Sequence, residues 1–227
     1  MGFSPSELKN KIAAKSLDRK FHYLFKKYKE FTLEPESYFV DTLMLCNQFR
    51  NTKGCIVECG VWRGGMSAGI AEILGNSRSY YLFDSFEGLP DAKEVDGPAA
   101  LKWQSNKTSP NYFDNGKVDM SFAKKAMEMA GVNNYELIKG WFSESLPKFN
   151  PPDSIAILHL DGDWYESTMD CLTHLYPRVA VNGLIIIDDY YAWDGCTRAV
   201  HDYLSKNNLA LRLHETTGGI CYIKKTK

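Results

Sequence analysis

The fold of this chain is decided by Ile155-Ala156-Ile157-Leu158-His159-Leu160-Asp161-Gly162-Asp163, together with the later stretch Leu184-Ile185-Ile186-Ile187-Asp188-Asp189. Each is a short apolar run, typical of a strand buried on both faces of a parallel sheet, that leads directly into carboxylates. Because ligands bind at the carboxyl ends of such strands, both acidic pairs are expected at one functional edge of the sheet. For either pair alone, a turn or helix-cap role explains the aspartates equally well.

Taken together, the acidic residues after these two strands indicate a cation site. Neighbouring carboxylates repel one another unless one is protonated or a cation lies between them. Oxygen donors with no Cys or His beside them suit a hard ion such as magnesium. Two such clusters on strands that the fold places side by side therefore favour a metal site, with candidate residues Asp161, Asp163, Asp188 and Asp189.

The composition is that of a globular protein with one large core. A length of 227 residues with 44% apolar content suits a single α/β domain spanning residues 1–227. The net charge of −1 gives no general attraction to nucleic acid or membrane, and no apolar run reaches membrane-spanning length. Neither nucleic-acid nor membrane partners are therefore expected. The six cysteines form no CxxC pair, which favours a reduced, cytoplasmic protein.

From Gly54 onward the chain alternates between strand and helix patterns. Strands are predicted at 55–59, 80–83, 135–138, 155–160 and 184–187, and helices at 67–74, 121–130, 168–175 and 197–205. A terminal antiparallel hairpin is predicted from 211–214 and 220–223. This order is typical of a doubly wound α/β fold with a mostly parallel, seven-stranded sheet.

Two segments lie outside this alternation. Residues 1–53 are expected to form an N-terminal helical extension, with helices at about 6–30 and 36–50. The first helix has an apolar stripe that is expected to dock on the body or on a second subunit, and a homo-oligomer (a dimer or higher) is predicted from it: Leu17, Phe21, Leu24, Phe25 and Tyr28. Residues 88–117 are long and rich in Pro, Asn, Asp and Gly, with interspersed aromatics, which predicts a substrate lid.

A loop with glycines follows the first strand, in the sequence Val57-Glu58-Cys59-Gly60-Val61-Trp62-Arg63-Gly64-Gly65. It lacks the G-x-G-x-x-G spacing of dinucleotide-binding proteins, because Trp62 stands where the second glycine is required. Glu58 before the glycines suits a cationic amino group, such as that of S-adenosylmethionine. Asp84, at the end of the next strand, is placed to accept both ribose hydroxyls of an adenosine. Ser85 either contacts the adenosine or belongs to the turn.

Five motifs occur in order along the chain. They are Glu58-Cys59-Gly60-Val61-Trp62-Arg63-Gly64-Gly65, Phe83-Asp84-Ser85-Phe86-Glu87-Gly88-Leu89-Pro90, Gly140-Trp141-Phe142-Ser143-Glu144-Ser145-Leu146-Pro147, Leu160-Asp161-Gly162-Asp163-Trp164-Tyr165-Glu166-Ser167-Thr168, and Asp188-Asp189-Tyr190 with Trp193, Gly195, Cys196, Arg198, Ala199 and Val200. In this combination they resemble the macrocin O-methyltransferase family. The resemblance extends from about Val57 to Val200 and implies a class I, Rossmann-like methyltransferase. Such enzymes use S-adenosylmethionine and magnesium to methylate sugar hydroxyls. A small sugar-containing acceptor is therefore expected, either a sugar or a glycosylated or nucleotide-linked compound.

The resemblance also implies roles for individual residues. Asp161, Asp188 and Asp189 are expected to bind the metal, and Asp163 to act as the general base. The cofactor-binding residues implied are Glu58, Gly60, Gly64, Asp84 and Ser85. The alternative for Asp163 is a loop cap beside Asp161, and His159 is expected to be a hydrogen-bonded core histidine.

Several other functions are compatible with parts of this pattern. A magnesium ion that binds two vicinal hydroxyls would also serve a catechol or another diol acceptor. A nicotinamide-dependent sugar oxidoreductase is disfavoured by the missing G-x-G-x-x-G and Tyr-x-x-x-Lys motifs. A noncatalytic scaffold has no reason to concentrate carboxylates, and a metal hydrolase leaves Glu58 and Asp84 unexplained. The sequence therefore predicts a metal-dependent sugar O-methyltransferase.

Overall fold

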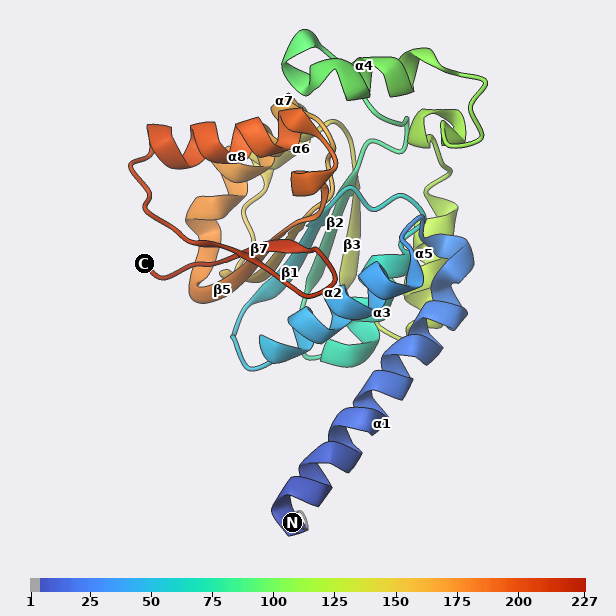
Figure 1. Ribbon diagram of the computed structural model, residues 1–227, viewed down its shortest axis with the longest axis vertical. Coiled ribbons are helices and arrows are strands. Elements are labelled where there is room, and N and C mark those ends of the chain that lie inside the picture. The colour runs from blue at the N-terminus through green and yellow to red at the C-terminus, as the bar shows by residue number, and fades with distance from the viewer. Residues whose placement is uncertain (1–4) are drawn as a thin grey trace.

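A seven-stranded sheet runs through the centre of the molecule (Figure 1). The computed structural model describes the backbone of residues 5–227 and the side chains of residues 15–227. The strands are β1 (Cys55–Cys59), β2 (Tyr80–Asp84), β3 (Tyr135–Lys139), β4 (Ile155–Leu160), β5 (Val179–Ile187), β6 (Leu213–Glu215) and β7 (Cys221–Lys224). They lie in the order β3-β2-β1-β4-β5-β7-β6. The first five are parallel, and β7 and β6 add an antiparallel edge, which confirms the predicted doubly wound sheet.

Helices cover both faces of the sheet. Their bounds are α1 (Pro5–Tyr28), α2 (Glu36–Gln48), α3 (Gly65–Leu74), α4 (Gly97–Ser105), α5 (Ser121–Met129), α6 (Phe142–Ser145), α7 (Tyr165–Leu175) and α8 (Asp194–Lys206). One apolar cluster joins α1, α2, α3 and α5 to one face, and a second joins α7 and α8 to the other. Short 3-10 turns connect them: η1 (Lys29–Phe31), η2 (Glu94–Asp96), η3 (Phe113–Gly116), η4 (Leu146–Lys148), η5 (Tyr176–Arg178) and η6 (Asp188–Tyr191).

The central strand β4 is buried along its whole length. Ile157 packs in the cluster that contains α1 to α3, whereas Leu158 packs in the cluster that contains α7 and α8. Side chains on a strand alternate between the two faces, so a strand covered on both faces needs apolar residues at nearly every position. This burial accounts for the continuous apolar run that precedes Asp161.

Strand β5 is longer than the predicted 184–187, because it begins at Val179. Its pairing with β4 shifts in register between Ile155 and Ile157. Asn182 has a φ of 66° at this irregularity, and the Asn182-Gly183 pair is typical of a turn in sequence. The Asn182-Gly183 pair therefore indicates a turn locally, but pairing with β4 makes this segment part of β5.

The N-terminal extension docks on the body through the C-terminal half of α1. Phe21, Leu24 and Tyr28 of the apolar stripe are fully buried in the molecule, and the Tyr28 hydroxyl donates a 2.5 Å hydrogen bond to Glu72 of α3. The stripe is therefore satisfied within one chain, and the predicted homo-oligomer stays a prediction. Residues 1–4 of the extension lie outside the described residues. Nowhere in residues 5–227 is there a helix long and apolar enough to cross a membrane.

The predicted lid segment contains regular structure that the sequence analysis did not assign. Residues 88–117 include η2, the nine-residue helix α4 and η3. Figure 1 shows α4 at the top of the molecule, beyond the end of the sheet from which α7 begins. Pro98 lies in the first turn of α4, where its fixed φ favours helix initiation, and Ala99-Ala100-Leu101 continues the helix.

Candidate active site

A cavity of about 470 Å³ lies at the carboxyl ends of β1, β2 and β4. The chain passes from β1 to β2 on one side and from β4 to β5 on the other, so the cavity occupies the point where the strand order reverses. The predicted site residues that line it are Glu58, Gly60, Asp84, Ser85, Asp161, Asp163 and Asp189. Asp188 lies just behind the wall, in contact with His159. Gly64 does not line the cavity.

Two glycines of the β1–α3 loop, Gly60 and Gly64, have different structural roles. Gly60 has a φ of 90°, and a Cβ there would lie only 1.6 Å from the carbonyl oxygen of Asp161. Gly60 thus lets the loops after β1 and β4 pass each other beside the cavity. Gly64 caps α3 with a φ of 80°, and a Cβ there would approach the Cα of Ala123 in α5 to 2.9 Å. Its role in this structure is close packing of α3 against α5.

The Asp84 carboxylate organises the glycine-containing loop. One oxygen accepts the amides of Val61 (2.7 Å) and Trp62 (2.8 Å), and the other accepts that of Phe86 (2.6 Å). Burial raises the pKa of Asp84, and these three amides oppose the rise. A carboxylate offers about four acceptor positions, so Asp84 has room for one ribose hydroxyl rather than the two expected. Ser85 donates to the Gly88 carbonyl (2.9 Å) and accepts from the Glu87 amide, which is the turn role.

Glu58 and His159 form a buried polar pair next to the cavity. The Glu58 carboxylate accepts from the Ser67 hydroxyl and, at 3.0 Å, from Nδ1 of His159. The other imidazole nitrogen, Nε2, lies 3.2 Å from the Asp188 carboxylate. Burial alone would lower the pKa of His159, but the hydrogen bonds to Asp188 and Glu58 raise it to about 10. His159 is a satisfied core histidine, as the sequence predicts, and it also bridges two of the predicted site residues.

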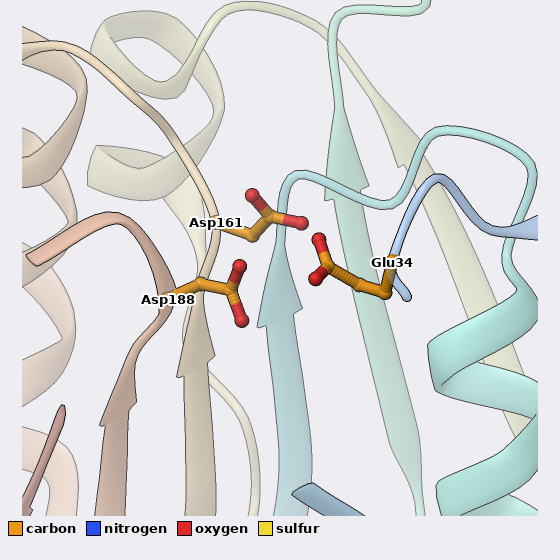
Figure 2. A group of neighbouring side chains, drawn as sticks. All are labelled: Glu34, Asp161 and Asp188. Atoms are coloured by element: carbon orange, nitrogen blue, oxygen red, sulfur yellow. The ribbon is translucent and has the colours of Figure 1, made fainter. Parts of the chain in front are cut away.

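Carboxylates from distant segments converge at the other end of the cavity. Oxygens of Asp161, Asp163 and Asp189 lie within 4.8 Å of one another, and so do oxygens of Glu34, Asp161 and Asp188. Figure 2 shows the second group: the three side chains point toward one another from the segment before α2, the end of β4 and the end of β5. Asp161 is common to both groups. The structure therefore brings all four predicted aspartates together and adds Glu34.

The electrostatics of these carboxylates favour a bound cation. Burial, followed by the neighbouring carboxylates, raises the pKa of Asp161 well above its usual value, and the same causes act on Asp189. Burial and the Asp188 charge raise the pKa of Glu34 to about 8. Like charges this close need a proton or a cation between them. An all-oxygen donor set fits a hard divalent ion such as magnesium.

Asp163 is held in an unusual backbone conformation. Its φ is 56°, and the Trp164 amide bonds to the Gly162 carbonyl at 2.6 Å, which closes a tight turn around it. The Asp163 amide donates to Asp189 (2.8 Å), and its carboxylate accepts from the Trp193 indole (2.9 Å). Burial raises the pKa of Asp163 to about 7, although the Trp193 hydrogen bond opposes the rise. Backbone strain of this kind persists where the surrounding structure enforces it, as it does at functional sites.

Three tryptophans connect the lid segment to Asp163. Trp103 of α4 packs edge-on against Trp164 and Trp193, with ring centroids 6.1 Å apart in both pairs. Trp164 and Trp193 pack on each other at 5.2 Å. The Trp164 indole also donates to the Pro90 carbonyl of the lid segment (2.9 Å). The segment 88–117 is thereby packed against the residues that flank and hold Asp163.

The mouth of the cavity presents exposed apolar side chains beside the exposed carboxylate of Glu166, and its floor is acidic. Leu33, Phe113 and Trp141 line it and expose 48%, 50% and 38% of their surface. The lining residues belong to the described part of the chain and include no Lys or Arg, whereas the lining carboxylates are Glu34, Glu58, Asp84, Asp161, Asp163, Glu166, Asp170 and Asp189. An exposed apolar patch of this kind marks a binding surface.

Sequence reasoning missed two functional candidates. Glu34 lies in a short stretch between two predicted helices, and nothing in its local pattern indicates that it enters a site formed by β4 and β5. The sequence identifies Trp193 only as part of a motif, and its hydrogen bond to Asp163 depends on how α8 packs. The one local indication is its position directly before α8.

Comparisons with known proteins agree with this geometry. Residues 43–225 match the family model described as macrocin-O-methyltransferase (TylF). The chain belongs to the macrocin O-methyltransferase family. Demethyldecarbamoylnovobiocin O-methyltransferase of Streptomyces niveus is 37% identical over 173 residues, which are 70% of this chain and 62% of that protein. An 8-demethyl-8-(2,3-dimethoxy-alpha-L-rhamnosyl)-tetracenomycin-C 4'-O-methyltransferase of Streptomyces olivaceus is 33% identical, over 82% of this chain and 70% of that protein.

This macrocin O-methyltransferase family member also resembles solved structures in its fold. The O-methyltransferase NovP superposes with a TM-score of 0.69 and 30% identity, covering 83% of this chain and 81% of that one. The predicted family and Rossmann-like methyltransferase fold are thus confirmed. The chain spans less than two thirds of the length of the Streptomyces niveus relative.

Proposed function

We propose that this protein is a metal-dependent S-adenosylmethionine O-methyltransferase that methylates a hydroxyl of a sugar-containing acceptor. The observation that carries the proposal is one cavity that joins the Glu58, Gly60 and Asp84 corner to the clustered aspartates. A donor site and an acceptor-activating site are thereby held next to each other. Membership in the macrocin O-methyltransferase family supports the same conclusion.

The proposed metal ligands are Asp161, Asp188 and Asp189, with Glu34 as a further carboxylate beside them. The donor set fits a divalent cation because buried, mutually repelling carboxylates lose their repulsion when it binds. When bound, magnesium supplies Lewis acidity and a fixed orientation for an acceptor hydroxyl. Vicinal sugar hydroxyls suit such a site because the three aspartates leave coordination positions open.

The proposed cofactor residues lie at the opposite end of the cavity. S-adenosylmethionine supplies an electrophilic methyl group. Glu58 offers a carboxylate to the amino group, Gly60 leaves the backbone open for close approach, and Asp84 has one acceptor position for a ribose hydroxyl. Ser85 lines the same wall.

Asp163 is the proposed general base. It lines the cavity beside Asp161 and Asp189, and burial raises its pKa to about 7, which suits a group that accepts a proton near neutral pH. The Trp193 indole fixes the orientation of its carboxylate. In this role the Asp163 carboxylate would accept the proton of the acceptor hydroxyl as the methyl carbon bonds to the hydroxyl oxygen and its bond to the sulfonium sulfur breaks, which would leave S-adenosylhomocysteine.

The cavity favours an acceptor that carries an apolar group over one linked to a nucleotide diphosphate. Phosphate needs basic side chains or free backbone amides, and the cavity lining has no Lys or Arg. The amides of Trp62 and Tyr165 near the cavity are already bound by Asp84 and Asp96. The exposed apolar side chains at the mouth instead suit an aglycone, and the Streptomyces olivaceus relative is named for methylating a rhamnosyl-tetracenomycin.

The first experiment is calorimetric titration of the protein with S-adenosylhomocysteine, with NAD⁺ as the parallel ligand. We expect binding of the first compound only. Methyl transfer is then assayed with Mg²⁺ or excess EDTA, on an aryl glycoside with vicinal hydroxyls, a nucleotide diphosphate sugar and a catechol. The expected order of activity puts the aryl glycoside first, and EDTA should abolish transfer.

Two variants complete this test. Asp161→Asn should lower kcat/KM by at least about 100-fold, because metal assistance contributes several kcal/mol to such reactions, while S-adenosylhomocysteine still binds. Asp153→Asn, at the exposed amino end of the same strand, is the matched control and should retain activity. Binding of NAD⁺ alone, or full activity of Asp161→Asn in EDTA, would refute the proposed function.

A further inference from the structure

A continuous hydrogen-bonded chain runs beneath the cavity from the proposed cofactor end to the proposed metal end. It passes from the Ser67 hydroxyl to Glu58, from Glu58 to Nδ1 of His159, and from Nε2 of His159 to Asp188. Glu58 and His159 are nearly inaccessible, with 2% and 1% of their surfaces exposed, and Asp188 exposes 9%. Because the His159 ring bonds to a carboxylate on each side, its position constrains the orientation of both carboxylates.

The sheet itself produces this arrangement. Glu58 of β1 is in register with His159 of β4, and His159 is in register with Ile186 of β5. Side chains two positions apart lie on the same face of a strand, so Asp188 follows Ile186 on the face that carries His159. Three adjacent strands thus place a carboxylate, an imidazole and a second carboxylate in one row.

We propose that His159 is a positioning residue that couples the affinity for the methyl-donor cofactor to the affinity for the metal ion. The proposal rests on the proposed function, because it takes Glu58 and Asp188 to be ligands at the two ends. Only 1% of the His159 surface is exposed, so its proposed action is on its two neighbours rather than on the acceptor. It acts by holding both carboxylates in their binding orientations.

The physical basis is the ring that the two carboxylates share. Glu58, His159 and Asp188 are buried and bonded in series, so a ligand that reorients one carboxylate also displaces the ring, and the ring displaces the other carboxylate. The second ligand then meets a carboxylate that the first ligand has already reoriented. Such coupling is reciprocal and typically amounts to roughly 5- to 150-fold in affinity.

The test compares two variants that each keep half of the bridge. In His159→Asn the side-chain amide stands near the position of Nδ1, so it can retain the contact with Glu58 and lose that with Asp188. In His159→Gln the amide reaches toward the position of Nε2, so the opposite contact can survive. Ser67→Ala removes the other partner of Glu58 and leaves the bridge intact, which makes it the matched control.

Calorimetry measures the affinity for S-adenosylhomocysteine without Mg²⁺ and with saturating Mg²⁺, and the affinity for Mg²⁺ with and without S-adenosylhomocysteine. In the unmodified protein, Mg²⁺ should raise the affinity for S-adenosylhomocysteine by at least about fivefold. In both His159 variants this ratio should fall to about 1. Ser67→Ala should weaken S-adenosylhomocysteine binding and keep the ratio. A merely structural role for His159 would weaken binding without removing the ratio.

The outcomes separate the two proposals. Binding of both ligands with a ratio near 1 in the unmodified protein overturns the role of His159 and leaves the proposed function in place. An unchanged ratio in either His159 variant, or a lost ratio in Ser67→Ala, also overturns it. Failure of the unmodified protein to bind S-adenosylhomocysteine at all refutes the proposed function, and this inference with it. Because two His159 variants are used, one that fails to fold leaves the other to decide.

Discussion

At the scale of single residues, the site depends on side chains that hold other side chains in place. Asp84 holds the loop after β1 through three amides, and Trp193 orients Asp163. A buried carboxylate at the end of a strand has several rotamers, and a hydrogen bond from a packed donor selects one of them. Hydrogen bonds to charged groups are worth about 1.5–3 kcal/mol, so losing such a donor should show in the rate.

The Trp193 indole offers a specific test. Trp193→Phe keeps an aromatic ring in the tryptophan cluster and removes the N–H that holds Asp163. We expect kcat to fall by roughly 10- to 100-fold, the equivalent of that lost hydrogen bond, with little change in the affinity for S-adenosylhomocysteine. Steady-state kinetics and calorimetry measure the two quantities.

Trp164→Phe is the matched control for this prediction. It removes an indole N–H from the same cluster, but one that bonds to the Pro90 carbonyl rather than to Asp163. Its kcat should therefore fall much less than that of Trp193→Phe. Equal losses in the two variants would show that the cluster contributes by packing only, and that the Trp193 hydrogen bond does not orient the Asp163 carboxylate.

At the scale of elements, α1 belongs to the core of the domain even though its N-terminal part extends away from the body (Figure 1). Its C-terminal half buries three apolar residues, and the chain then turns through η1 into the stretch that carries Glu34. Docking of α1 and α2 therefore places a carboxylate in the site. The N-terminal extension is thus a structural part of the domain and contributes a carboxylate to the site.

Substitution of Phe21 in α1 tests how much this docking contributes to the free energy of unfolding. Phe21→Ala should lower the free energy of unfolding by about 3–5 kcal/mol, because it empties a fully buried aromatic site. Tyr23→Ala, at a position that is 63% exposed, should change it by less than about 0.5 kcal/mol. Urea unfolding measures both values. A small effect of Phe21→Ala would mean that α1 docks only weakly on the body.

At the scale of the whole molecule, acidic side chains are concentrated in one cavity of a nearly neutral protein. The net charge is only −1, yet the floor of the cavity combines carboxylates from strands β1 and β2, from the segments directly after β4 and β5, and from the stretch before α2. Folding brings these like charges together, and their repulsion opposes folding until a cation binds. The folded state should therefore gain stability from its ligands.

Thermal unfolding tests this linkage. At about 100 times its dissociation constant, a ligand that binds only the folded state adds about 2.7 kcal/mol. For a domain of this size that corresponds to a rise in Tm of roughly 5–10 °C. Mg²⁺ and S-adenosylhomocysteine should each produce such a rise. Asp189→Asn should lose the response to Mg²⁺ and keep that to S-adenosylhomocysteine; equal responses to Mg²⁺ in both proteins would contradict the assignment of Asp189 as a ligand.

Much of the architecture was predictable because local pattern and burial agree. The apolar runs of β1, β4 and β5 are typical of a sheet covered on both faces, and the loop from Glu58 to Gly65 with Asp84 indicates the proposed cofactor end of the cavity. Helix α4 was missed because it is short and lies in a stretch rich in turn-forming residues. The first half of β5 was missed because Asn182-Gly183 indicates a turn locally, whereas pairing with β4 extends the strand.

The sequence by itself determined the sheet, its functional edge and the four aspartates, because these depend on residues that are neighbours in the chain or on adjacent strands. Only the tertiary structure decided that Glu34 joins the aspartates, that Gly64 packs against α5, that Trp193 holds Asp163 and that His159 links Glu58 to Asp188. Each of these contacts joins segments whose distance depends on how helices and strands pack. Hydrophobic periodicity shows which face of an element is buried, but it does not show which distant side chain meets it there.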